Sequence, residues 1–302
     1  MQKVLIILGP TAVGKTKIAL EIADKLNGEI VSADSRQVYR YMDIGTAKPT
    51  LEEQRRAPHH LIDIINPDEK FSAAECAKRA TEAIYEILRR RKKPIVVGGS
   101  GLYIRALSEG LFEGPGANVE IRKRLEREAE ELGKLHLYQR LKIIDPTAAR
   151  KIYPNDLKKI IRALEVYELT RKTISELRQK GAYPLSEVEF AKAGLVLDRK
   201  ELYRRIDERV DRMFVLGFVE EVKGLINMGY SLELNALDTL GYKEVFSYLQ
   251  GEIDLNGAIG KMKQSTRNYA KRQLTWFRKD KEIIWFDAKD ENLANKIISH
   301  LE

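Results

Sequence analysis

The chain has 302 residues and a formal net charge of +8, from 53 basic and 45 acidic side chains. This length is enough to bury a large core and predicts one or two domains, while the single cysteine, Cys76, excludes an internal disulfide. The four histidines are scattered and no cysteine pair exists, which excludes a zinc site. Because the sequence has no apolar run of about 18 residues and no secretion leader, we expect a cytoplasmic protein without a membrane partner.

The chain begins with the order strand, glycine loop, helix. An apolar run at residues 4–8 precedes the sequence GPTAVGKT, and residues 16–26 show the periodicity of a helix. In this order the loop N–H groups and the helix N-terminus surround a phosphate, Lys15 adds positive charge, and the Thr16 hydroxyl can bind Mg²⁺. The expected phosphate contacts are Gly9, Pro10, Thr11, Ala12, Val13, Gly14, Lys15 and Thr16. The loop alone leaves open whose phosphate is bound, and a nucleotide such as ATP is one alternative.

A second predicted strand, residues 29–33, is followed directly by four polar side chains. These are Asp34, Ser35, Arg36 and Gln37. Ligands of an open α/β sheet bind at the carboxyl ends of its strands, so these side chains should face the phosphate loop. An ordinary polar turn is the alternative.

No later strand clearly supplies the acidic residue that a nucleotide-hydrolysing enzyme places beside its phosphate loop. The apolar run at residues 94–97 leads into the sequence GGSG instead. Two further predicted strands, 193–197 and 283–286, end in Asp198 and Asp287, and each aspartate is typical of a turn after a strand. Asp198 nevertheless keeps a small-molecule or nucleotide kinase as an alternative.

The middle of the chain changes character at the Gly-Pro-Gly sequence of residues 114–116. Helical patterns follow at residues 119–132 and 135–144, and Asp156 can cap a third helix. The sequence therefore predicts an α/β fold, in which a P-loop parallel-sheet core with flanking helices carries an inserted all-helical domain. The predicted segments are 1–115 for the first part of the core, 116–189 for the helical insertion, and 190–302 for the second part of the core with a basic C-terminal helix.

The excess positive charge is concentrated near the C-terminus, between Lys261 and Lys279. On a helix, four of these basic side chains would share one face beside an apolar stripe. They are Lys263, Arg267, Lys271 and Arg278. Such a face on a docked helix suits the backbone of a nucleic acid. A solvated basic face without a partner is the alternative.

Seven sequence motifs along the chain match one family, and together they are far more specific than the phosphate loop alone. The motifs are GPTAVGKT, SADSRQVYRYMDIGTAKP, HHLIDI, GGSGLYIRAL, RALEV, LGYKE and TRNYAKRQLTWFR. With them the chain resembles, nearly from end to end, the bacterial tRNA dimethylallyltransferases, also called tRNA isopentenyltransferases. Two departures are mild: Ser100 stands where the family usually has threonine, and Asn268 replaces a common glutamine.

The resemblance implies transfer of a dimethylallyl group from dimethylallyl diphosphate to N6 of the adenosine 3′ of the anticodon, position 37 in tRNA. Diphosphate would then leave an allylic carbon, so no water has to attack phosphorus and the acidic residue of a hydrolase is unnecessary. The implied partners are the tRNA anticodon stem-loop and dimethylallyl diphosphate, with Mg²⁺ at Thr16 as cofactor. Arg209 is implied as a further diphosphate ligand, and we expect a monomer.

The resemblance also implies roles for single residues. Asp34 would remove a proton from N6, Ser100 would hydrogen-bond the same amine, and Lys15 and Arg209 would complete the catalytic set. The target base must flip out of the anticodon loop to reach a buried diphosphate. The implied tRNA contacts are Asp34, Ser35, Arg36, Gln37, Ser100, Arg122, Lys158, Lys159, Ile160, Ile161, Arg162, Asp238, Gly241, Tyr242, Lys243, Lys271, Arg272, Gln273, Trp276 and Arg278.

Two other classes of protein remain as alternatives. A kinase would share the phosphate loop and turn over ATP, with Asp198 as its metal-linked carboxylate. A non-catalytic RNA-binding protein would explain the basic helix but not the sequences GPTAVGKT and DSRQ.

Overall fold

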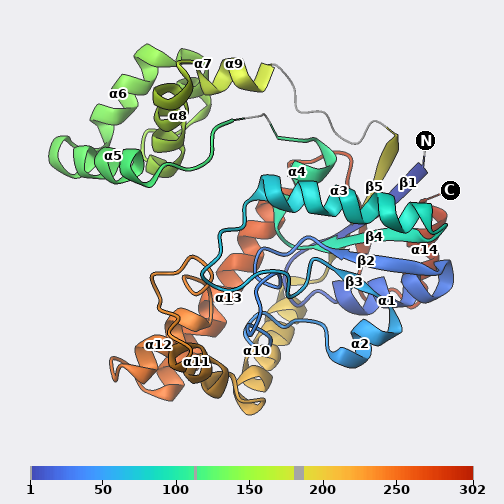
Figure 1. Cartoon of the computed structure of the whole chain (residues 1–302). Helices are drawn as coiled ribbons and strands as arrows, with labels where there is room; N and C mark the ends of the chain where they lie inside the picture. The colour runs from blue at the N-terminus through green and yellow to red at the C-terminus, as the bar shows by residue number, and fades with distance from the viewer. Residues whose placement is uncertain (1, 112–113, 180–186, 302) are drawn as a thin grey trace. The chain divides into compact units, whose positions relative to one another are not determined.

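The computed structural model describes residues 2–111, 114–179 and 187–301. These residues contain a sheet of six parallel strands in the order β3-β2-β4-β1-β5-β6 (Figure 1). The prediction of an α/β fold with a parallel sheet is confirmed. The strands are β1 (Gln2–Leu8), β2 (Gly28–Ser32), β3 (His59–His60), β4 (Lys93–Gly98), β5 (Val188–Val196) and β6 (Ile284–Asp287).

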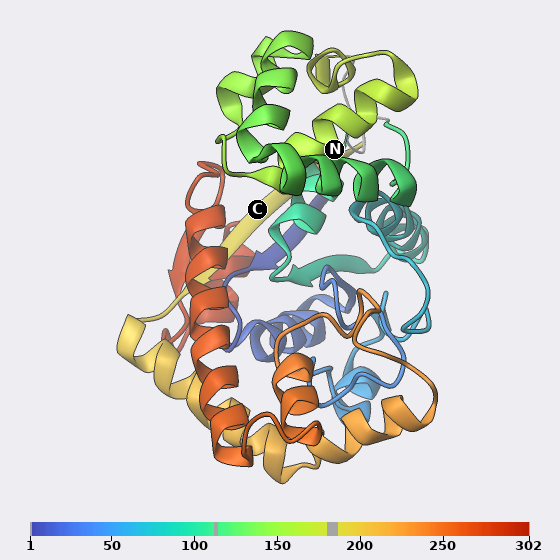
Figure 2. The same cartoon turned by 90° about the vertical axis from the view of Figure 1, so that its left-hand side faces the viewer.

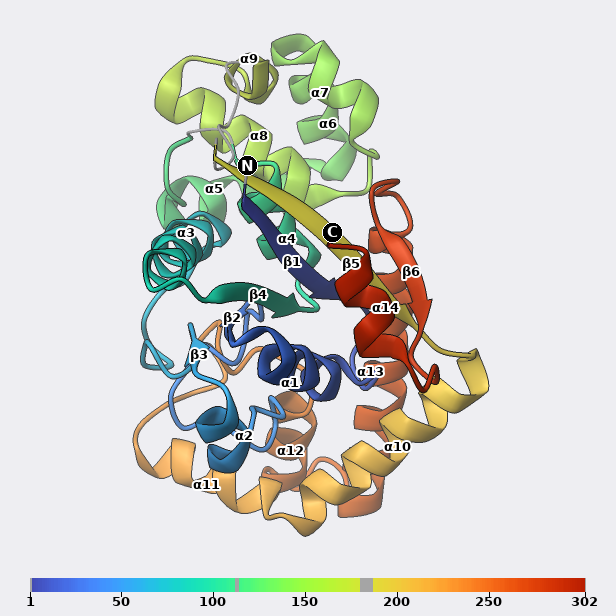
Figure 3. The ribbon, with the colours of Figure 1, turned by 90° about the vertical axis from the view of Figure 1, so that its right-hand side faces the viewer.

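Helices cover both faces of this sheet. Alternate residues of β1 point to opposite faces, so that Val4 and Ile6 join one apolar cluster and Leu5 and Ile7 join another. Because both faces are buried, β1 reads in the sequence as a continuous apolar run. The first face is covered by α3 (Ala73–Arg89) and α4 (Gly101–Ser108), and the second by α1 (Lys15–Leu26) and α14 (Leu293–Ser299), as Figure 3 shows.

The other helices of this part of the chain include two that run side by side, α10 (Arg199–Val215) and α13 (Leu255–Phe277), seen in Figure 2. Ion pairs join them, from Lys263 to Asp211 at 2.6 Å and from Arg267 to Asp207 at 2.7 Å. The remaining helices are α2 (Leu51–Arg56), α11 (Phe218–Asn227) and α12 (Tyr242–Leu249). None of the described helices is both long and apolar enough to cross a bilayer.

Strand β5 is longer than the predicted run at residues 193–197, because Val188 already pairs with Gln2 of β1. Lys192 interrupts the apolar pattern of β5, so the sequence does not reveal the full length of the strand. The side chain of Lys192 is only 3% exposed, and its ammonium group binds the carboxylates of Asp280 and Glu282 at 2.8 Å each. A buried charge is tolerated when it is paired in this way, but an apolar pattern does not reveal it.

The chain divides into two compact units, one formed by Met1–Ser108 with Leu185–Glu302 and the other by Glu109–Pro184. The second unit overlaps the predicted insertion 116–189, whose last two residues belong to β5 instead. Its described elements are helices with a core of their own, which includes Leu125 and Leu164. They are α5 (Val119–Leu132), α6 (Lys134–Ile144), α7 (Pro146–Lys151), α8 (Leu157–Thr170) and α9 (Ile174–Gln179).

A fully buried carboxylate, Glu165, joins the elements of this helical unit. It accepts hydrogen bonds from Arg122 at 2.8 and 2.9 Å, from Arg162 at 2.7 Å and from the Asn118 N–H at 2.7 Å. Burial alone would raise the pKa of Glu165, but the hydrogen bonds from both arginines hold it below its ordinary value. Glu165 therefore remains ionised and ties the start of α5, at Asn118 and Arg122, to α8.

Candidate active site

The loop between β1 and α1 has the backbone of a phosphate-binding turn. Gly9 and Gly14 have φ angles of 148° and 108°, and a side chain at Gly9 would lie 2.7 Å from a carbonyl oxygen of β5. Glycine is needed at both positions. The Lys15 ammonium group folds over the loop and donates to the carbonyl oxygens of Gly9 at 3.1 Å and Pro10 at 2.8 Å. This geometry offers an anion the N-terminus of α1 and a lysine.

Three charged groups meet beside this loop. The pKa of Lys15 is lowered to about 8, chiefly by burial and also by the charge of Arg209, while the charge of Asp34 opposes both effects. Burial also lowers the pKa of Arg209, again opposed by Asp34, and Arg209 donates to the Thr11 hydroxyl at 3.3 Å. Two partly buried cations against one carboxylate leave positive charge at the loop, as a diphosphate requires.

The ends of β2 and β4 meet next to Asp34. One Asp34 oxygen, Oδ1, accepts the N–H of Arg36 at 2.8 Å and that of Gln37 at 3.4 Å. The Ser100 hydroxyl, which follows β4, accepts the N–H of Ser35 at 3.1 Å. These contacts fix the direction of the Asp34 carboxylate. Asp34 lines a pocket together with Thr11 of the phosphate loop, and Gln37 lines a small cavity together with Thr16.

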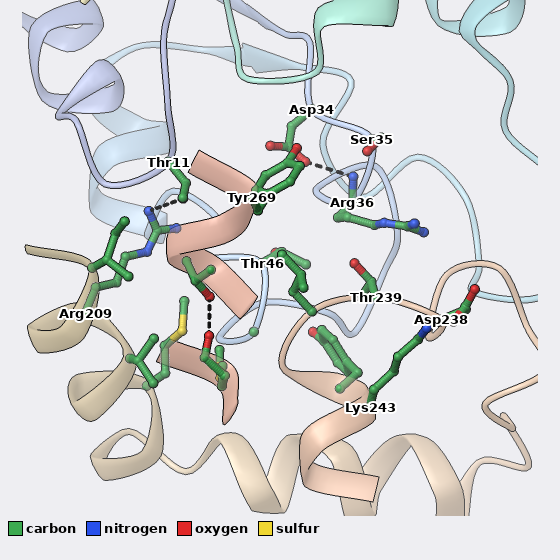
Figure 4. Close-up of a pocket in the computed structure, with 18 of the residues that line it drawn as sticks. Thr11, Asp34, Ser35, Arg36, Thr46, Arg209, Asp238, Thr239, Lys243 and Tyr269 are labelled. Carbon is green, nitrogen blue, oxygen red and sulfur yellow. Dashed lines mark hydrogen bonds and ion pairs between the residues drawn. The ribbon is translucent and has the colours of Figure 1, made fainter. Parts of the chain in front are cut away.

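A pocket of about 330 Å³ opens between these groups. Figure 4 shows Thr11 and Arg209 on one side of it, Asp34 with Tyr269 on another, and Thr239 with Lys243 farther away. Apolar side chains complete the lining, namely Ile206, Val210, Met213 and Met262. The pocket therefore joins an anion site, a carboxylate and an apolar wall within one unit of the chain.

Asp198 caps a helix and does not line this pocket. It is exposed and caps α10, where its Oδ1 accepts the N–H of Lys200 at 2.9 Å and that of Glu201 at 3.3 Å. These backbone hydrogen bonds lower its pKa. The kinase alternative thus loses its metal carboxylate, and the described residues contain no cluster of three His, Cys, Asp or Glu side chains that could hold a metal ion.

A family model described as IPP transferase matches residues 37–280 of the chain. The chain belongs to the IPP transferase family. It is 50% identical over 302 residues to a tRNA dimethylallyltransferase of Carboxydothermus hydrogenoformans, which covers 99% of this chain and 97% of the relative. Family membership confirms the resemblance drawn from the motifs.

Two crystal structures support the same assignment. The full-length tRNA isopentenylpyrophosphate transferase of Bacillus halodurans is 41% identical, with a TM-score of 0.73 and coverage of 100% of this chain and 97% of that one. A eukaryotic dimethylallyltransferase, described as acting on tRNA, is 30% identical with a TM-score of 0.82, and covers 99% of this chain and 77% of that one.

In this member of the IPP transferase family, two residues that the sequence analysis did not assign to the site help to build it. Tyr269 of α13 lines the pocket. Burial and the charge of Asp34 raise its pKa to about 12, against a hydrogen bond with Ser100, so the phenol stays protonated. Glu221 accepts three consecutive backbone N–H groups, residues 43–45, at 2.6 to 3.0 Å, and the Tyr242 hydroxyl at 2.7 Å. It thereby holds a loop that lines the pocket.

Four of the predicted tRNA contacts have buried side chains. Ile160 and Ile161 lie in the core of the helical unit. Tyr242 packs edge-on against Phe218 at 5.1 Å between ring centroids. Gln273 is 6% exposed and binds backbone groups. A docked helix exposes only one face, so side-chain contact between these four residues and tRNA stays a prediction that the structure does not test.

The other predicted tRNA contacts fall into two groups. Some already have partners within the protein. In the helical unit, Arg122 and Arg162 bind Glu165, and Lys159 pairs with Asp156. In the other unit, Arg36 donates to the carbonyl oxygen of Asn235, Gln37 donates to the carbonyl oxygens of Thr46 and Ala47, Lys243 pairs with Asp238, and the Gly241 N–H donates to Glu244. The exposed residues include Lys158 in the helical unit and, on or next to α13, Lys271, Arg272, Trp276 and Arg278.

The predicted basic face of α13 is shorter than its spacing indicated. Lys263 and Arg267 are neutralised by the two carboxylates of α10 already described. Lys271 and Arg278 remain exposed, with Arg272 beside them over the Tyr269 ring. Of the four residues of the predicted face, only Lys271 and Arg278 are exposed.

Proposed function

We propose that the chain is a tRNA dimethylallyltransferase, which modifies N6 of adenosine 37 with the dimethylallyl group of dimethylallyl diphosphate and releases diphosphate. The observation that carries this proposal is one pocket lined by Thr11 of the phosphate loop, by Arg209, by the Asp34 carboxylate and by apolar side chains. Membership of the IPP transferase family supports it.

The two ends of the donor match the two kinds of pocket lining. Diphosphate would bind the loop N–H groups with Lys15 and Arg209, whose partly buried cationic groups are strong donors to phosphate oxygens. The five-carbon chain would lie against apolar side chains such as Val210, Met213 and Met262. A nucleotide would instead bring a polar base and ribose against this wall.

In the reaction a C–N bond forms as the allylic C–O bond breaks. The Asp34 carboxylate takes the proton from N6, because the amine lone pair is delocalised into adenine and attacks poorly until that proton is drawn away. Ser100 orients the same amine. The electron pair of the broken C–O bond leaves with diphosphate, and Lys15 and Arg209 stabilise the charge that develops on its oxygens.

Magnesium fits this site as a partner of the donor. Mg²⁺ binds through one or two protein oxygens together with substrate phosphates. The Thr16 hydroxyl, in the first turn of α1, would be one such oxygen, and Thr16 lines a small cavity with Ser32 and Gln37. When bound, the ion would neutralise diphosphate charge, while Thr16 holds it at the loop.

The exposed basic residues of α13 support binding of tRNA as the acceptor. Changing both Lys271 and Arg278 to Gln should weaken tRNA binding at low salt and flatten its salt dependence. Each lost phosphate contact reduces the log–log slope of affinity against salt by about 0.7 to 0.9, because fewer counterions are released. A salt titration of tRNA affinity measures this slope, and an unchanged slope in the folded double variant would remove this helix from the RNA site.

A matched control for that titration is a double variant of Lys263 and Arg267 to Gln. These two cations already pair with Asp211 and Asp207, so their loss should leave the salt slope nearly unchanged. Dimethylallyl diphosphate binding should be unaffected in both double variants.

The reaction itself is tested with unmodified tRNA, dimethylallyl diphosphate and Mg²⁺, followed by digestion and mass analysis of the nucleosides. N6-dimethylallyladenosine is the expected product. A tRNA with guanosine at position 37 should remain unmodified, since guanosine lacks the N6 amine. Failure to modify an adenosine-37 tRNA would contradict the proposed function.

A further inference from the structure

A single buried amide, that of Gln273, joins the two sides of the active site. Its Oε1 accepts the N–H of Thr11 in the phosphate loop, and its Nε2 donates to the carbonyl oxygen of Gly99 after β4, both at 2.9 Å. The side chain points inward from α13, a helix whose neighbouring residues Lys271 and Arg272 are exposed. Both polar ends of the amide are thus used by backbone groups of the site.

The close approach of α13 to the β4 turn shows that this contact is built into the fold. A side chain at Gly99 would lie 2.3 Å from Nε2 of Gln273, and one at Gly101 would lie 2.3 Å from the Trp276 ring. Two glycines in the sequence GGSG therefore let the turn lie directly against this helix. An ordinary turn would keep α13 farther away and leave the amide of Gln273 out of reach.

Each of the two backbone groups that bind Gln273 lies next to a different part of the proposed active site. On the donor side, Thr11 carries the hydroxyl that accepts from Arg209. On the acceptor side, Gly99 precedes Ser100, whose hydroxyl accepts the N–H of Ser35 beside Asp34. The amide is therefore the link between the group that binds diphosphate and the group that takes the proton.

We propose that Gln273 is a positioning residue for prenyl transfer, which fixes the phosphate loop against the Gly99–Ser100 turn and so sets the distance between donor and base. This inference rests on the proposed function. It also reassigns the Thr11 N–H, which is committed to Gln273, so that the phosphate cradle begins at Ala12. A displacement of about 1 Å between reacting groups can slow a reaction by about 100-fold.

The test compares Gln273→Met with the same substitution at Gln264, an exposed residue of the same helix. Methionine has about the length of glutamine and is also uncharged, but it lacks the amide and so leaves the Thr11 N–H and the Gly99 C=O without this partner. Single-turnover transfer at saturating substrates should fall by about tenfold or more, and Mg²⁺-diphosphate should bind at least about fivefold more weakly. The affinity for tRNA should stay within about twofold of the parent value, as should every property of Gln264→Met.

A purely structural role predicts something else, namely a lower Tm with an unchanged single-turnover rate and unchanged diphosphate affinity in the folded variant. That result would overturn the proposal. If Gln273→Met does not fold, Gln273→Glu takes its place: when ionised it still accepts from Thr11 but cannot donate to Gly99, so an unchanged rate would be equally decisive. Binding of diphosphate requires no tRNA, so this measurement tests the role of Gln273 even if the parent protein transfers no prenyl group. Absence of prenyl transfer by the parent protein would contradict the proposed function, not the role of Gln273.

Discussion

Asp34→Asn should slow single-turnover prenyl transfer by about 100-fold or more, the usual scale of general-base catalysis. Asparagine keeps the size of the side chain and the Oδ1 that accepts from the N–H groups of Arg36 and Gln37. It cannot take the proton from N6. Donor binding should therefore change little, and the rate of the chemical step, measured by rapid quench with saturating tRNA, should carry the whole effect.

Asp198→Asn is the matched control for this change. Asparagine caps helices as well as aspartate does, so α10 should be undisturbed. Prenyl transfer should proceed at the parent rate, whereas a kinase that relied on Asp198 would lose activity. Equal rates for Asp34→Asn and the parent protein would reduce Asp34 to a binding residue.

Lys15→Ala should lower the rate of transfer by about 100- to 1000-fold, because removing one donor from a developing anion costs about that much in other enzymes. Donor binding should weaken as well, and Thr16→Ala should raise the Mg²⁺ concentration needed for activity. The affinity for tRNA should be nearly intact in both variants, since Lys271 and Arg278 are exposed and do not line the pocket. Equal losses of tRNA and diphosphate binding would contradict this separation.

The pH dependence of diphosphate binding isolates the charge of Lys15. Its pKa of about 8 in the free protein means that the ammonium form prevails below that pH and is lost above it. Affinity for diphosphate should therefore fall as the pH rises from about 7 to about 9, after correction for titration of the ligand itself. Lys15→Met should lose this step. A wild-type profile no steeper than that of Lys15→Met would show that Lys15 does not govern binding.

The phosphate loop and the residues after β2 were predictable from sequence because their signals are local. GPTAVGKT lies within one strand–loop–helix unit, and Asp34 to Gln37 follow one apolar strand at the edge where ligands bind. Asp34 and Lys15 therefore needed no knowledge of the rest of the fold. Arg209 was assigned through the resemblance to a family, because its position on α10 carries no local signal.

The inner face of α13 was not predictable in the same way. Polar residues occur all round this helix, and only its docking decides that Gln273 and Tyr269 turn inward while Lys271 faces outward. Likewise, the partners that neutralise Lys263 and Arg267 lie on another helix, 52 and 60 residues earlier in the chain. Spacing along one helix cannot reveal a carboxylate that tertiary packing brings to it.

Isotope labelling of the released phosphate tests the central claim most directly. It distinguishes a diphosphate that leaves carbon in prenyl transfer from a phosphate group whose phosphorus atom is attacked by water. The protein is incubated with unmodified tRNA, dimethylallyl diphosphate and Mg²⁺ in ¹⁸O-labelled water, with a parallel sample that contains ATP instead. We expect one diphosphate, free of ¹⁸O, for each dimethylallyladenosine formed, and no consumption of ATP. Orthophosphate that carries ¹⁸O, or ATP turnover with tRNA left unmodified, would contradict the assignment of this pocket to prenyl transfer.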